Sequence, residues 1–120
     1  MPATEPPLTL VILGTGLWGT ALGHLAAGRG HRVLCWSRRS GSPLAELLPQ
    51  AQVVVSAVAM AGVTAVAEQV AAVGLPPSSI LVSVTKGLEI THGLTPSQIW
   101  RAWLPQQPLA VLSGPNLSQE

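Results

Sequence analysis

LTLVILGTGLWGTAL, residues Leu8 to Leu22, is the stretch that decides how this chain folds. Leu8 to Leu13 is a short apolar run, which is the composition of a strand buried on both faces of a parallel sheet. From Leu17 to Ala27 the apolar residues take on helical spacing. The glycines of this stretch stand in the pattern G-x-G-x-x-G, at Gly14, Gly16 and Gly19. The stretch therefore predicts a strand, a tight turn and a helix in direct succession.

Each glycine of this pattern has a physical role that a larger residue would hinder. Gly14 allows the turn off the strand, Gly16 lets the backbone approach a pyrophosphate, and Gly19 lets the helix pack closely on the strand. The N–H groups at the start of the helix and the helix dipole both attract phosphate charge. Because the glycines follow a strand pattern and open a helix pattern, we interpret them as a dinucleotide-binding fingerprint.

The alternative is a membrane-spanning helix from Leu8 to Ala27. Its only ionisable residue is His24, and Gly19 and Gly23 have the spacing of a helix-dimer motif. However, four glycines in ten residues make a poor helix, and no basic flank precedes the run. We therefore favour the nucleotide site and expect no association with a membrane.

The composition indicates a single domain with a surface that is poor in charge. Of the 120 residues, 48% are hydrophobic and only 9% are charged, so the surface is either unusually poor in charge or partly covered by something that is absent. A net charge of +1 gives no reason to expect nucleic acid as a partner. The one cysteine, Cys35, allows no internal disulfide and suits a reducing cytoplasm. We expect residues 1–7, which are rich in proline, to be a loose tail before a domain over 8–120.

Strand and helix patterns alternate along the rest of the chain. This alternation predicts an α/β fold of the Rossmann type, with a doubly wound parallel sheet that binds its ligand outside the carboxyl ends of the strands. Further strands are predicted at Arg32–Trp36, Gln52–Val58, Ser79–Val84 and Leu109–Leu112, and helices at Leu44–Leu48, Met60–Val73 and Ser97–Trp103.

The loop after the second predicted strand bears on the choice of cofactor. A site selective for NAD places Asp or Glu about 20 residues after the glycines, where the carboxylate binds the ribose 2′-hydroxyl. This chain has Ser37 there, followed by Arg38 and Arg39, and a guanidinium pairs well with a 2′-phosphate. The alternative is a solvated basic loop. We favour NADP(H), or the use of both NADP(H) and NAD(H).

Lys86, the only lysine in the sequence, follows the fourth predicted strand and precedes a glycine. An ammonium there could hold a phosphate or polarise a carbonyl, although a surface lysine without a role fits equally well. Trp18, inside the glycine pattern, could cover the cofactor or fill the core, whereas the other three tryptophans are expected to pack. The three histidines have no carboxylate or cysteine at ligand spacing, so we expect no metal site.

Three segments carry a resemblance to one enzyme family: Gly14–Leu22 (GTGLWGTAL), Ser83–Glu89 (SVTKGLE) and Ser113–Glu120 (SGPNLSQE). In the same order they resemble the GxGxWGTAL, TKGLE and SGPSFAxE segments of bacterial NAD(P)-dependent glycerol-3-phosphate dehydrogenases. The short region with Arg38 and Arg39 is similar to cyanobacterial members. The resemblance implies reversible reduction of dihydroxyacetone phosphate to sn-glycerol 3-phosphate for phospholipid synthesis in the cytoplasm, by an enzyme whose full-length form is expected to be a homodimer.

The resemblance also implies roles for individual residues. Asn116 departs from the Ser or Thr that the family has at this position, but its amide can still form a hydrogen bond. In the family, the lysine that acts as general acid/base lies in a helical substrate domain, which we expect beyond Glu120, so we expect this chain to bind nucleotide weakly without turnover. Contacts with NAD(P)H are implied for Leu17, Trp18, Arg38, Arg39, Lys86 and Ser118, and contacts with the substrate for Lys86, Gly114 and Asn116.

Two alternatives of other kinds stay open. One is another dehydrogenase of the same fold, against which the TKGLE and SGPN segments argue. The other is a module that binds NADP(H) without catalysing a reaction.

Overall fold

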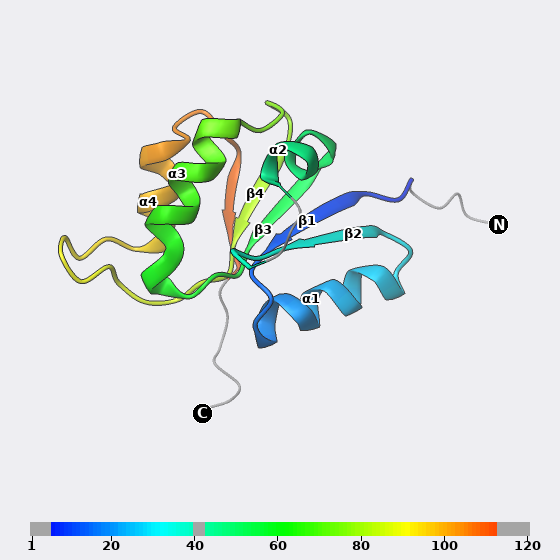
Figure 1. The fold of residues 1–120 in the computed structure, drawn as a ribbon, viewed down its shortest axis with the longest axis horizontal. Helices are drawn as coiled ribbons and strands as arrows, with labels where there is room; N and C mark the ends of the chain where they lie inside the picture. Colours follow the sequence, from blue (N-terminus) through cyan, green and yellow to red (C-terminus); the bar gives the residue numbers. More distant parts are fainter. Residues whose placement is uncertain (1–5, 40–42, 113–120) are drawn as a thin grey trace.

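The computed structural model describes residues 6–39 and 43–112, which form a parallel sheet with helices on both faces (Figure 1). The sheet has five strands in the order β2-β1-β3-β4-β5 in this part of the chain. This arrangement confirms the predicted doubly wound α/β fold. The strands are β1 (Thr9–Leu13), β2 (Arg32–Trp36), β3 (Val53–Ser56), β4 (Ile80–Ser83) and β5 (Leu109–Val111). The helices are α1 (Leu17–Gly28), α2 (Leu44–Leu47), α3 (Val63–Val73) and α4 (Pro96–Trp103), with short 3-10 turns η1 (Leu48–Gln50) and η2 (Met60–Gly62).

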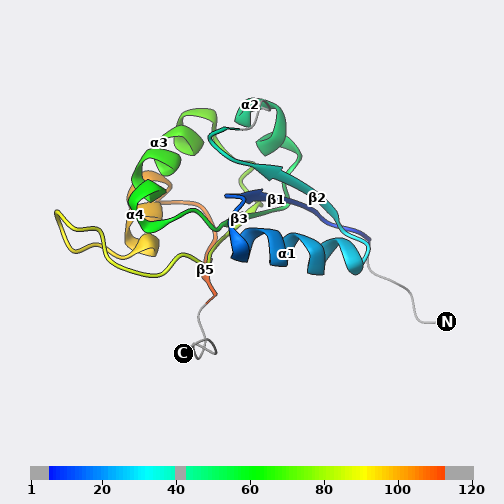
Figure 2. The same ribbon diagram turned by 60° about the horizontal axis from the view of Figure 1, so that its bottom comes forward.

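The order in which the chain adds strands to the sheet changes direction between the adjacent strands β1 and β3. The chain passes from β1 through α1 to β2 on one side, then crosses back and continues through β3, β4 and β5 on the other side. Right-handed crossovers therefore place α1 on one face and α3 and α4 on the other, where α2 also lies (Figure 2). Such a switch point leaves a crevice at the carboxyl ends of the strands, which is where ligands of these folds bind.

The main core lies between the sheet and the helices α2, α3 and α4. Val11 of β1 and Val54 of β3 are register partners and point to this face, where they meet the apolar side of α3. Trp100 of α4 is fully buried in the same cluster. Burying a large apolar side chain contributes about 1.5–3 kcal/mol, so this layer fixes the sheet that carries the loops. The α3 residues in the core are Val63, Val66, Ala67 and Val70.

Helix α1 covers the opposite face through its glycines. Gly19 and Gly23 are the buried residues of this helix. A Cβ at Gly23 would lie 3.4 Å from the Cδ1 atom of Ile12, so the absence of side chains lets α1 lie directly on β1. No helix within the described ranges is long and apolar enough to cross a membrane. The membrane alternative for Leu8–Ala27 is wrong because this segment folds as a strand and a separate helix.

Several elements begin or end at other residues than the sequence predicts. The third strand is limited to Val53–Ser56, because it pairs with β1 only as far as Leu13. The residues expected at its end, Ala57 and Val58, belong instead to a loop at the crevice. The helix expected from Met60 is regular only from Val63, after the 3-10 turn η2.

Helix α4 begins at Pro96, one residue before its predicted start, and a capping box stabilises its amino-terminal end. The Thr95 hydroxyl accepts a hydrogen bond from the Gln98 N–H, and the Gln98 side chain accepts one from the Thr95 N–H at 2.8 Å. Trp36 and Trp100 are buried as expected, whereas Trp103 is 40% exposed and packs only in part.

Candidate functional site

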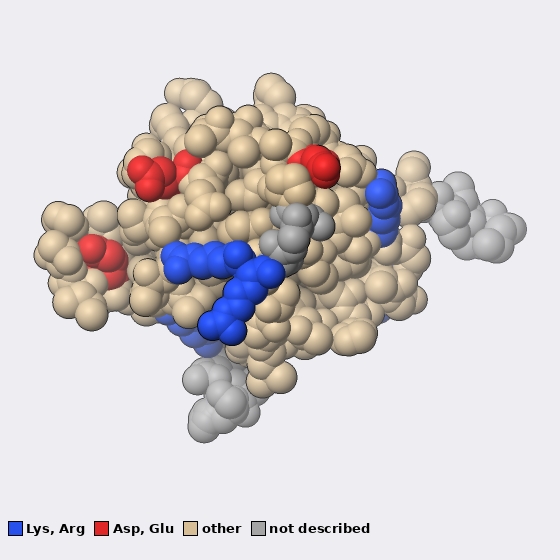
Figure 3. Space-filling model, in the orientation of Figure 1, with Lys and Arg blue, Asp and Glu red and all other residues tan. Residues whose placement is uncertain are grey.

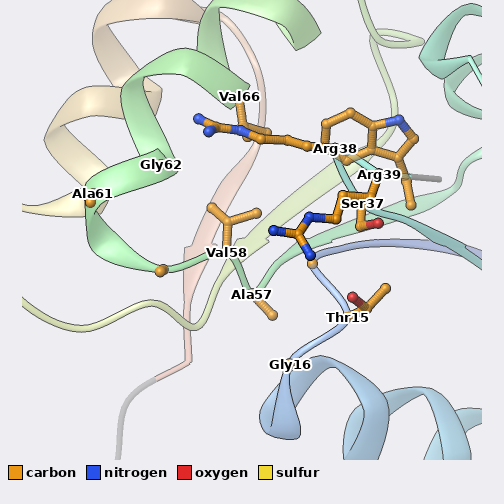
Figure 4. Close-up of a pocket in the computed structure, with 13 residues that line it drawn as sticks. Thr15, Gly16, Ser37, Arg38, Arg39, Ala57, Val58, Ala61, Gly62 and Val66 are labelled. Atoms are coloured by element: carbon orange, nitrogen blue, oxygen red, sulfur yellow. The ribbon is translucent and has the colours of Figure 1, made fainter.

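The loops after β1, β2 and β3 enclose a pocket of about 580 Å³ beside the switch point (Figure 4). Its walls are the glycine loop, the segment from Trp36 to Arg39, and residues between Ala57 and Gly62. The sequence predicted a ligand site outside the carboxyl ends of the strands, and the strand order β2-β1-β3 is what brings these three loops together. Gly62 and Val66, at the start of α3, also line the pocket, and no sequence pattern predicted their place in it.

A second hollow of about 350 Å³ adjoins the first. It is lined by Leu17 and Trp18 of α1 and by the segment from Val84 to Lys86 after β4. Gly16 and residues Ala57–Ala59 line both hollows, so the two form one continuous crevice across the carboxyl edge of the sheet. An elongated ligand with two separate ends fits such a crevice better than a compact ligand does.

The fold itself requires two of the three glycines in the fingerprint. Gly14 has a φ of +106°, which favours glycine, and its N–H donates to the carbonyl oxygen of Trp36 at 2.7 Å. At Gly19 a Cβ would collide with the carbonyl oxygen of Gly14 and would lie 3.3 Å from Cγ2 of Ile12. Both positions need glycine because the turn and the helix lie close to neighbouring backbone.

Gly16 differs, because the surrounding protein leaves room for a side chain. Its φ is −73°, which any residue can adopt, and a Cβ there would have no neighbouring atom within 4 Å. Gly16 is also the N-cap of α1, whose first turn has no side-chain cap and no acidic residue. An anion at this open position would face the positive end of the helix dipole, so the space fits a pyrophosphate.

Arg38 and Arg39 extend into the first hollow from its β2 side (Figure 4). Arg38 lies toward α3, where a Cβ on Gly62 would be 3.5 Å from Nη2 of Arg38, and Arg39 points toward Ala57. Both side chains are exposed, and neither forms an ion pair with a described carboxylate. Basic side chains gather at the centre of the face shown in Figure 3, with acidic ones nearer its margins. The first hollow can therefore attract an anionic group.

The second hollow contains the exposed residues at the start of α1. Leu17 is 86% exposed and Trp18 is 64% exposed, so Trp18 does not fill the core. Lys86 lies across the hollow from them on its own loop, exposed and without an ion pair to a described carboxylate. The second hollow thus combines a mostly apolar lining with one basic residue, Lys86.

The loop that follows Lys86 is closed by Glu89. Its Oε1 atom accepts a hydrogen bond from the His92 N–H at 2.6 Å and lies 3.4 Å from Nδ1 of the same histidine. The Glu89 N–H donates to the carbonyl oxygen of Leu94 at 2.7 Å. The hydrogen bond from the His92 backbone lowers the pKa of the Glu89 carboxyl below its ordinary value.

Three of the residues implied by the resemblance, Gly114, Asn116 and Ser118, lie outside the described residues. The described ranges contain no group of three or more His, Cys, Asp or Glu side chains that could hold a metal ion.

The family model for the N-terminal part of NAD-dependent glycerol-3-phosphate dehydrogenase matches residues 39–120. The chain is 58% identical over 114 residues to glycerol-3-phosphate dehydrogenase [NAD(P)+] of Synechococcus sp. (strain JA-2-3B'a(2-13)), with 95% of this chain and 36% of the relative covered. It is 52% identical over 111 residues to the protein of the same name from Acaryochloris marina, with 92% and 36% covered. The chain thus spans about a third of the length of these curated relatives.

Two solved structures show the same fold. The glycerol-3-phosphate dehydrogenase of Coxiella burnetii matches with a TM-score of 0.81 and 23% identity, over 92% of this chain and 42% of that one. The Plasmodium falciparum glycerol-3-phosphate dehydrogenase matches with a TM-score of 0.76 and 20% identity over the same shares.

Proposed function

The chain belongs to the NAD-dependent glycerol-3-phosphate dehydrogenase family, and on this premise we propose that it is the coenzyme-binding part of such an enzyme. The observation that carries the proposal is the continuous crevice at the switch point, with two arginines at one end and a lysine at the other. Gly16 and the start of α1 lie in its middle, where the pyrophosphate of NAD(P)H would bind. The proposed binding domain spans residues 8–120, of which the structure describes 8–39 and 43–112.

The first hollow takes the adenosine half of the coenzyme. Arg38 and Arg39 both extend into it from its β2 side, so a 2′-phosphate beside them would form charge-assisted hydrogen bonds. A carboxylate that would select the free 2′-hydroxyl is absent from the described lining of this hollow. The proposal is therefore NADP(H) as the preferred coenzyme, with NAD(H) accepted more weakly.

The second hollow takes the nicotinamide half and the substrate. The bound coenzyme supplies a hydride for reduction of a carbonyl. Leu17 and Trp18 line the hollow and shield it in part from water, while the Lys86 ammonium attracts a phosphate or polarises the carbonyl oxygen. Gly114 and Asn116 are proposed to contact the substrate, and Ser118 the coenzyme, on the resemblance of their segment.

The complete dehydrogenase reaction requires a substrate domain in addition to this coenzyme-binding part. The curated relatives are more than about two and a half times as long, and we assign the helical substrate domain and its acid/base lysine to their remaining length. The complete enzyme is proposed to reduce dihydroxyacetone phosphate to sn-glycerol 3-phosphate in the cytoplasm, for phospholipid synthesis and as a homodimer. The 120-residue chain alone then binds coenzyme weakly and does not turn over.

Calorimetric titration of the chain with NADPH and with NADH tests the proposal. Arg38→Ala is expected to weaken the binding of NADPH about tenfold or more, because a hydrogen bond to a charged group is lost. The binding of NADH should stay nearly unchanged. Arg29→Ala removes the same charge from the far end of α1 and serves as the control. Equal losses for the two coenzymes would refute the 2′-phosphate role. Oxidation of NADPH with dihydroxyacetone phosphate by this chain would refute the absence of turnover.

A further inference from the structure

Lys86 is held on both sides against the loop that follows β3. On its amino-terminal side, the Thr85 hydroxyl donates a hydrogen bond to the carbonyl oxygen of Val58 at 2.6 Å. On its carboxyl-terminal side, Gly87 has a φ of +119°, and a Cβ there would lie 3.3 Å from Cγ of Met60. Val58 and Met60 both line the second hollow, so Lys86 follows a residue that is hydrogen-bonded to the wall of the site and precedes one that lies close to it.

The Thr85 hydroxyl continues the connection between β3 and β4 into the loops. Just beyond the last residue pair of β3 and β4, the Val84 N–H donates a hydrogen bond to the carbonyl oxygen of Ser56 at 3.0 Å. One residue later, the bond from Thr85 to Val58 joins the two loops directly. Thr85 is half-buried, which limits the competition of water for this bond. The Thr85 side chain thus extends the hydrogen bonding between the two segments beyond the end of the strands.

We propose that Thr85 is a positioning residue, which through its bond to Val58 directs Lys86 into the second hollow. A lysine stem has four freely rotating carbons, so its ammonium group reaches a fixed place only if its backbone is held. The hydroxyl of Thr85 and the close packing of Gly87 on Met60 supply that restraint. The role of the ammonium group toward coenzyme and substrate rests on the proposed function, whereas the restraint on Lys86 does not.

The sequence makes Lys86 directly observable, because it is the only lysine. Reductive methylation with ¹³C-formaldehyde gives one dimethyl-lysine signal by NMR, which its loss in Lys86→Arg distinguishes from that of the terminal amine. Thr85→Val removes the hydroxyl and keeps the shape, and Thr85→Ser keeps the hydroxyl. Ser79→Ala is the matched control, since the Ser79 hydroxyl donates to the carbonyl oxygen of Ala51 at 2.5 Å at the opposite end of β4.

In the free protein, the Lys86 signal is expected to move in Thr85→Val and to stay in place in Thr85→Ser and Ser79→Ala. The dissociation constant for NADPH should rise about three- to tenfold in Thr85→Val alone. If Thr85→Val does not fold, Gly87→Ala crowds Met60 and strains the positive φ of Gly87, so it should displace the backbone next to Lys86 and move the signal as well. An unmoved Lys86 signal in the folded Thr85→Val or Gly87→Ala variant would overturn the proposal, as would a Ser variant that behaves like the Val variant.

The NMR signal of Lys86 in the free protein and the dissociation constant for NADPH test this proposal and the proposed function separately. If the wild-type chain binds neither NADPH nor NADH, the proposed function fails, and the signal of the free protein still decides whether Thr85 positions Lys86.

Discussion

A Cβ on Gly14 would lie 2.7 Å from the carbonyl oxygen of Ala57 and 2.9 Å from its carbonyl carbon. The two residues directly follow the adjacent strands β1 and β3, between which the strand order changes direction. Contact with a backbone is more restrictive than contact with a side chain, because the backbone of a sheet cannot rotate away. The first glycine of the fingerprint is therefore required by the sheet as well as by a ligand.

Gly14→Ala should destabilise the protein by about 3 kcal/mol, from the positive φ together with the clash at Ala57. Gly30→Ala separates the two causes, since Gly30 has a φ of +88° and no atom within 4 Å of its Cβ position. That variant should lose only about 1–2 kcal/mol. Urea denaturation measures both values. Equal losses would show that the contact with Ala57 carries no cost.

Gly16→Ala should leave the stability almost unchanged and weaken coenzyme binding. The added methyl group meets no protein atom within 4 Å, and the backbone needs no rearrangement. The change in the free energy of unfolding should stay below about 1 kcal/mol, the usual effect at an N-cap. NADPH and NADH should both bind about tenfold more weakly, because a misfit at the pyrophosphate costs on the order of 1–3 kcal/mol. Unchanged titrations of both coenzymes would show that no ligand approaches this residue.

The sequence predicted the site best where the local pattern determines the geometry. The fingerprint predicted the turn at Gly14 and the start of α1 at Leu17, and the strand pattern of Arg32–Trp36 located Arg38 and Arg39. Alternating strands and helices then placed Lys86 at the same edge.

Contacts between residues far apart in the sequence left no such pattern. The bond from Thr85 to Val58 spans 27 residues, and the approach of Gly62 to Arg38 depends on where α3 begins. The role of Trp18 could not be chosen from the sequence, because an apolar residue at a helix start suits a core and a ligand site equally well. The packing of α1 on its glycines decides this question by leaving Trp18 outside the core.

Trp18 should report coenzyme binding by its fluorescence. It is 64% exposed in the second hollow, whereas Trp100 is fully buried and Trp36, in the wall of the first hollow, is only 6% exposed, so these two contribute little to quenching. Addition of NADPH should reduce quenching by acrylamide, because the nicotinamide half covers the indole. Trp103→Phe should keep this protection, since Trp103 is on α4 and outside the lining of either hollow. Protection that survives Trp18→Phe would place the coenzyme elsewhere.

The loop after Lys86 should loosen in acid. The hydrogen bond from the His92 N–H lowers the pKa of Glu89 from its ordinary value of 4.5, so folding favours the ionised carboxylate. The stabilisation is then complete above pH 4.5 and is lost as the pH falls through the lower pKa of the folded state. The amide resonance of His92 should stay constant down to that range and shift below it, in a ¹⁵N–¹H titration.

Two variants identify the cause of this transition. Glu89→Gln should abolish the shift, because the amide has no charge to lose. His92→Asn keeps the backbone donor and removes the imidazole that lies 3.4 Å from the carboxylate. Because the backbone hydrogen bond is the largest cause of the lowered pKa, most of the acid transition should persist in His92→Asn. If that variant restores the Glu89 carboxyl to its ordinary pKa, the imidazole rather than the backbone closes the loop.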